Sequence, residues 1–178
     1  CVSAELLKTN NVKTESYIFD WTRSNILSVI DIIKYGNNYH IKQNIENIGI
    51  TKYNKQFTHL YYPHHSYIEH KDYMIRCSNR FFNALNRNQH IKFLYMSNKK
   101  HTITDEELNT LINTLEQNYK TLDFEIIIIM YEGKGRSISL SKYGHKYKIY
   151  SCYSPKEFNS NPMRPDKFYV DMFNHIFT

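Results

Sequence analysis

The sequence is poor in cysteine, with three in 178 residues: Cys1, Cys77 and Cys152. A small, odd number argues against the disulfide framework of a secreted domain and favours a reducing compartment. We therefore expect a cytoplasmic protein. Heavy use of Asn, Ile, Lys and Tyr is typical of an AT-rich genome, such as that of a large DNA virus or an AT-rich bacterium. If the source is viral, the expected place is the cytoplasm of the host cell.

A long apolar run is also missing. The longest, Ile126 to Tyr131, has the length of a strand and falls well short of the roughly 18 residues that a membrane span needs. No signal peptide is recognisable. We expect a soluble chain with no membrane partner. The chain begins at Cys1 and not at Met, which predicts a further segment upstream.

Sequence motifs for metals and nucleotides are absent. No Cys-x-x-Cys or His-Glu-x-x-His spacing occurs. His59, His64, His65 and His70 lie close in sequence, but His64 and His65 would point to opposite faces of an extended segment, which disfavours a shared metal. Gly133-Lys134-Gly135 is too short for a dinucleotide fingerprint. We expect no metal and no cofactor.

What is present is the composition of one ordinary globular domain over residues 1–178. The chain is 41% hydrophobic and 22% charged, and it is long enough to bury a core. The net charge of +6 permits contact with anions, but the basic residues are scattered along the sequence. We therefore do not expect nucleic acid as a partner.

Hydrophobic periodicity predicts alternating helices and strands. A short helix follows Cys1 and ends near Asn10, and further helices are expected over residues 24–35, 72–87, 104–119 and 166–177. Strands are expected over residues 57–62, 91–96, 124–131, 138–140 and 147–153, the last two alternating like edge strands. Residues 37–56 are predicted to be loops and short pieces. The order from residue 72 onward predicts an α/β fold, with helices packed on a mixed, partly parallel sheet.

Three local signals sharpen this prediction. Ser24 is the expected cap of the second helix, and Gly36 its expected end. Thr104 followed by Glu107 forms a capping-box pattern. The four isoleucines from Ile126 to Ile129 are all β-branched, which favours a central strand with both faces buried.

The N-terminal third carries a recognisable pattern. A Cys opens a helical segment, a basic turn follows, and a Ser-x-x-Phe-Asp-Trp box comes next, in Cys1-Val2-Ser3-Ala4, Leu6-Leu7-Lys8, Val12-Lys13 and Ser16 to Trp21. A second zone is Tyr62-Pro63-His64-His65 with the helix after it. This pattern resembles a family of uncharacterised domains classed as papain-like cysteine peptidases, best over residues 1–35 and again around 57–97. The strand that precedes the Cys in such families is absent here.

The resemblance implies a thiol hydrolase or transferase with Cys1 as nucleophile. A helix N-terminus lowers the pKa of a cysteine, and a papain-like site adds a His base and a polar group that orients it. His64 or His65 would be the base, with the family pattern favouring His65. Asp20 is the first choice for the orienting group, with Asp72 or Glu132 as alternatives. The resemblance thus implies a protein or peptide-like substrate as the partner, with an amide, isopeptide or thioester as the group that reacts.

Other interpretations stay open. Cys77 lies mid-helix and Cys152 on a strand, where cysteine usually serves as a small buried hydrophobe. Asp20 would brace a turn equally well. An N-terminal-nucleophile hydrolase would use the α-amine of Cys1, but those folds place the nucleophile on a strand. The main alternative is a non-catalytic or sugar-related α/β binding module, which the many tyrosines would suit.

Overall fold

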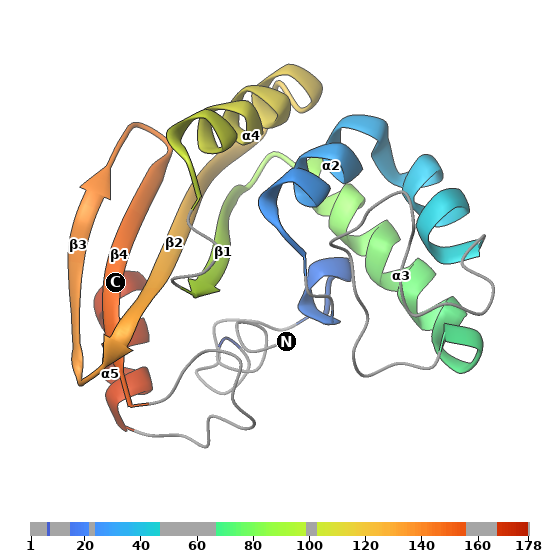
Figure 1. The fold of residues 1–178 in the computed structure, drawn as a ribbon. Coiled ribbons are helices and arrows are strands. Elements are labelled where there is room, and N and C mark those ends of the chain that lie inside the picture. Colours follow the sequence, from blue (N-terminus) through green and yellow to red (C-terminus); the bar gives the residue numbers. More distant parts are fainter. Residues whose placement is uncertain are drawn as a thin grey trace. The chain divides into compact units, whose positions relative to one another are not determined.

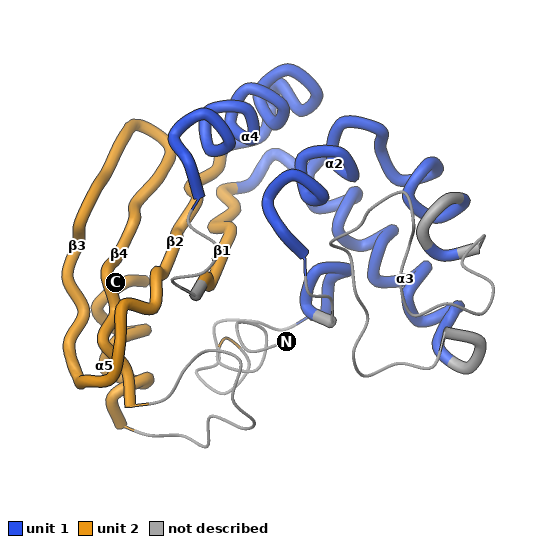
Figure 2. Tube along the Cα trace, in the orientation of Figure 1, with its two compact units in different colours: residues 1, 15–89, 103–123 blue, residues 2–14, 90–102, 124–178 orange. Residues whose placement is uncertain are grey.

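The structure, a computed structural model, describes residues 7, 15–21, 24–46, 67–98, 103–155 and 167–177 (Figure 1). Within these residues the chain forms four α-helices, a 3-10 turn, a π-helical turn and four strands. Their order is η1 (Ile18–Trp21), α2 (Ile26–His40), η2 (Ile41–Glu46), α3 (Tyr67–Leu85), β1 (His90–Asn98), α4 (Asp105–Asn118), β2 (Asp123–Lys134), β3 (Ser137–Tyr143), β4 (Tyr147–Ser154) and α5 (Lys167–Phe177). Figure 2 shows two compact units: η1, α2, η2, α3 and α4 form the first, and the strands with α5 form the second.

Helix α2 begins one residue later than the sequence predicts. The N-cap is Asn25, whose side-chain oxygen accepts the backbone N–H of Ser28 at 2.9 Å, so the prediction of Ser24 as the cap is wrong. Both are good capping residues, and the geometry selects the one directly before Ile26. Gly36, the expected end of the helix, has φ 81° and ψ 178° and interrupts the helical dihedrals, but α2 continues beyond it to His40.

The chain does not turn into a loop after Gly36. It resumes a helical path to His40 and continues as the π-helical η2, so the prediction of loops is wrong for residues 37–46. Residues 47–56 lie outside the described part. Burial explains the difference, because His40 and Ile45 are both completely buried and hold this polar segment against the first unit. Tertiary packing outweighs a weak local preference for helix.

Two contacts and one cap organise the rest of the first unit. Ser78 of α3 donates a hydrogen bond to the Asn37 side chain, and Asn37 donates to Asn79, both at 2.7 Å. These bonds tie the segment after Gly36 to α3. In α4, Thr104 accepts the Glu107 N–H and the Glu107 carboxylate accepts the Thr104 N–H, which confirms the predicted capping box.

The second unit contains a four-stranded sheet in the order β1-β2-β4-β3. Strands β2 and β4 are parallel, with Ile128 opposite Ile149, and β3 is antiparallel to β4. Strand β2 therefore has a neighbour on each side, which confirms the predicted central strand. The prediction of an edge position for residues 147–153 is wrong, because β4 pairs with β2 and β3. The alternation of β4 reflects one covered face: Tyr150, Cys152 and Ser154 are buried between more exposed residues.

Helix α5 covers one face of this sheet (Figure 1). The core between them consists of Ile127, Ile129 and Tyr131 of β2, Tyr150 and Cys152 of β4, and Tyr169, Met172, Phe173 and Ile176 of α5. Residues of β2 on the opposite face, Phe124, Ile126 and Ile128, are buried as well. The α/β class with a mixed, partly parallel sheet is thus confirmed, while the single domain over residues 1–178 stays a prediction. None of the described helices is long and apolar enough to cross a membrane.

Candidate active site

The three reactive side chains that the sequence singles out, Cys1, His64 and His65, lie outside the described residues. The same holds for the predicted helix after Cys1, apart from Leu7, and for the predicted strand over residues 57–62. The described part does contain Asp20, the two other orienting candidates and the two remaining cysteines.

Asp20 lies in the Ser-x-x-Phe-Asp-Trp box, which folds into the 3-10 turn η1. Its carboxylate accepts a hydrogen bond from the Tyr17 backbone N–H, and its own N–H donates to the Tyr17 carbonyl at 3.1 Å. This reciprocal pair closes the turn. Asp20 therefore has a structural task, which is the alternative that the sequence left open beside an orienting role.

The turn is docked onto α3 by apolar and polar contacts. Ile18 is completely buried, and the Phe19 ring meets the Phe81 ring edge-on with centroids 5.1 Å apart. Arg80 donates from Nε to the Ser16 carbonyl at 2.9 Å and from Nη2 to the Cys77 Sγ at 3.1 Å. The box that carries the family resemblance is thus a rigid, anchored element of the first unit.

Arg80 is the residue that sequence reasoning missed. It belongs to no motif, and its contact with Ser16 joins residues 64 positions apart. The available signal was its place three residues after Cys77 on a helix, which puts the two side chains on neighbouring positions of one face. That spacing alone does not distinguish an anchoring arginine from a solvated one.

The two described cysteines are structural. Both Cys77 and Cys152 are completely buried. Burial raises the pKa of the Cys152 thiol to about 12, and its sulfur lies 3.8 Å from the Met172 Sδ in the core under α5. A thiol of this kind is protonated at neutral pH and out of reach of a substrate, whereas nucleophilic cysteines are partly exposed thiolates.

The remaining polar candidates belong to different elements of the two units. Asp72 is exposed on α3 in the first unit, and Glu132 is half-buried on β2 in the second. His40 is completely buried, and desolvation lowers its pKa to about 3, so it is a poor proton carrier at neutral pH. Among the described residues, no three His, Cys, Asp or Glu side chains form a group that could hold a metal ion.

Comparisons with known proteins add no assignment to this picture. No family model matches the chain, and neither the curated proteins nor the solved structures include a match.

Proposed function

We propose that the chain is a papain-like thiol hydrolase or transferase that acts on an amide, isopeptide or thioester. Cys1 attacks the substrate carbonyl and forms a thioester, while the leaving group takes its proton from the imidazolium of His64 or His65. Water then releases the acid, or a second amine or thiol takes over the acyl group. Backbone N–H groups at the start of the first predicted helix would stabilise the oxyanion.

The observation that carries this proposal is the burial of the two other cysteines. Cys77 and Cys152 are sealed in the cores of the two units, so Cys1 is the cysteine left for chemistry. The family-like pattern supports the same residue, since it begins at Cys1. Its Ser-x-x-Phe-Asp-Trp part folds into a turn that Asp20 closes and Arg80 anchors.

The test measures alkylation of each cysteine by iodoacetamide at neutral pH, followed by peptide mass spectrometry. A nucleophile paired with a His has a pKa well below the usual value of about 8.5, so Cys1 should label much faster than Cys77 and Cys152. Separate His64→Ala and His65→Ala variants identify the base, because losing the imidazolium slows Cys1 labelling. His59→Ala, from the same segment, is the matched control and should leave the rate unchanged.

A version with one Ala ahead of Cys1 tests the N-terminal-nucleophile alternative. Labelling that survives this addition points to an imidazole partner, and labelling that disappears points to the α-amine. A Cys1 that reacts no faster than the buried cysteines would overturn the proposal.

A non-catalytic binding module is the second candidate, and one observation favours it. Tyr143 and Tyr153 expose 75% and 45% of their surface on β3 and β4, although large aromatic side chains are usually buried. Exposed aromatics of this kind mark interaction surfaces. Unreactive Cys1 together with ligand binding that depends on Tyr143 or Tyr153 would favour the module over the enzyme.

A further inference from the structure

The β3–β4 hairpin and the turn before it carry side chains of one charge sign. Residues 133–155 contain Lys134, Arg136, Lys142, Lys146 and Lys148 and no Asp or Glu, a net +5 against +6 for the whole chain. Basic residues elsewhere are scattered along the sequence, but these five lie between residues 134 and 148, at the end of β2, in the turn after it and on the hairpin at the side of the sheet. Lys148 forms an ion pair with Glu125 of β2 at 2.8 Å, which ties the turn end of the hairpin to the neighbouring strand.

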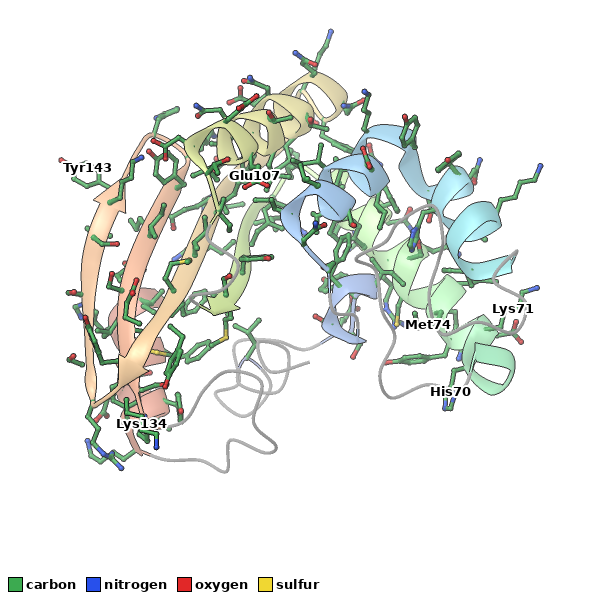
Figure 3. The ribbon with its side chains drawn as sticks, viewed as in Figure 1. His70, Lys71, Met74, Glu107, Lys134 and Tyr143 are labelled. Carbon is green, nitrogen blue, oxygen red and sulfur yellow. The ribbon has the colours of Figure 1, made fainter. Side chains whose placement is uncertain are left out.

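The charges flank an open strand. β3 is the last strand of the sheet, and six of its seven residues are exposed. Figure 3 shows Lys134 near one end of the hairpin and Tyr143 at the other, with the Tyr143 side chain pointing away from the sheet. A seven-residue strand is roughly 23 Å long, so cations at its two ends can follow an extended polyanion.

Hydroxyl and aromatic groups lie between and beside these cations. Ser137 and Ser139 are exposed along β3 and offer hydrogen-bond donors, whereas the Ser141 hydroxyl already donates to the Ile149 carbonyl at 2.9 Å. Tyr143 is 75% exposed and follows Lys142, so the two side chains extend to opposite sides of this edge strand. At the turn, the Gly144 N–H donates to the Tyr147 carbonyl at 2.9 Å, which fixes the backbone on which Tyr143 stands.

We infer that this hairpin surface binds single-stranded nucleic acid. Lysines and serine hydroxyls contact phosphates, and an exposed tyrosine stacks on an unpaired base without reading its identity. A duplex keeps its bases stacked on one another and offers Tyr143 nothing to stack on. A membrane surface fits less well, because membrane-bound elements insert a broad apolar face and β3 alternates serines with few apolar residues. This partner departs from the expectation drawn from the sequence, where the charges are dispersed.

The chain offers a matched pair of sites for the test. Lys142 and Tyr143 are adjacent and exposed on β3, and Lys34 and Tyr35 are adjacent and exposed on α2, with Tyr35 52% exposed. The Lys142→Gln/Tyr143→Ala and Lys34→Gln/Tyr35→Ala variants remove the same groups from the two places. Urea unfolding of both variants confirms that each remains folded before binding is compared.

Binding is measured by fluorescence anisotropy with labelled oligothymidine and oligouridine of about 15 nucleotides, within the range that single-strand binders occupy. The hairpin variant should bind at least about tenfold more weakly, and the α2 variant should change by less than about twofold. A plot of the logarithm of affinity against the logarithm of salt concentration should become shallower by about 0.7 for each phosphate that the hairpin variant no longer neutralises.

Four outcomes would overturn the inference. One is equal weakening by both double variants, and another is equal affinity for a duplex of the same charge. The third is binding to vesicles of anionic phospholipid with no binding to either oligonucleotide. A Tyr143→Ala variant that keeps full affinity would likewise exclude stacking of a base on Tyr143 and leave only electrostatic attraction to any polyanion. None of these results depends on Cys1, so the proposed thiol chemistry is tested separately.

Discussion

Replacing Gly36 with alanine isolates the free energy of one backbone conformation. Gly36 has φ 81° and ψ 178°, a region that is almost restricted to glycine and costs other residues about 1–3 kcal/mol. A Cβ built at this position meets no atom within 4 Å, so steric overlap with neighbours adds nothing. Alanine also restricts the unfolded chain, which offsets about 0.4–1 kcal/mol. The net expectation is a decrease of about 1–2 kcal/mol in the free energy of unfolding.

Gly133→Ala is the matched control. Its φ is not in the positive range, and the added Cβ would lie 3.7 Å from the Tyr153 ring, an ordinary contact. This variant should be neutral or slightly more stable. Both are measured by urea unfolding followed by far-ultraviolet circular dichroism. If Gly36→Ala costs no more than Gly133→Ala, the break in α2 does not require the glycine conformation, and the reasoning fails.

Two further predictions concern a cap and a buried histidine. Thr104→Ala removes the acceptor for the Glu107 N–H and should lower the free energy of unfolding by about 1 kcal/mol. Thr110→Ala removes only an exposed bond to the Glu106 carbonyl and should lower it much less. Equal effects of the two variants in urea unfolding would contradict the capping role. His40 has its pKa lowered from 6.5 to about 3 by burial, so the unfolded chain takes up this proton first as the pH falls. The contribution of neutral His40 to the free energy of unfolding is complete above about pH 6.5 and should fall by about 2 kcal/mol at pH 5. When the free energy of unfolding is measured between about pH 4 and 7, His40→Gln should remove this decrease.

The fold was predictable where a short stretch of sequence is enough to determine the local structure. The Thr104 to Glu107 box contains both partners of its two hydrogen bonds, and the isoleucines from Ile126 to Ile129 require burial on both faces. The edge or interior position of β4 was not predictable in this way. Alternation reports that one face is covered, and it does not report how many strands lie alongside. The pairing of β4 with β2 on one side and with β3 on the other decides that question.

The helical path of residues 37–46 was missed for a related reason. Asn37 is a weak helix former, and it is held by Ser78 and Asn79 of α3, some 40 residues later in the chain. Contacts over such distances leave no periodic trace in the sequence. The same applies to Arg80, whose bond to the Ser16 carbonyl anchors the turn that the motif had marked. The sequence motif marked the turn, but Arg80, the residue that anchors the turn, could be identified only from the structure.

Asp20 offers a test that separates a structural role from a catalytic one. Its carboxylate accepts the Tyr17 N–H and closes η1, and a carboxylate has two oxygens with about four acceptor positions, so this bond is compatible with orienting an imidazole. Asp20→Asn keeps an oxygen for Tyr17 but removes the negative charge, whereas Asp20→Ala removes both. Asp20→Ala should lower the free energy of unfolding by about 1 kcal/mol or more, and Asp20→Asn should cost less. If Asp20 orients the base, both variants should slow Cys1 alkylation, because the imidazolium loses the charge that favours it. Alkylation that slows in Asp20→Ala alone would assign Asp20 to the turn and leave Asp72 or Glu132 as the orienting group.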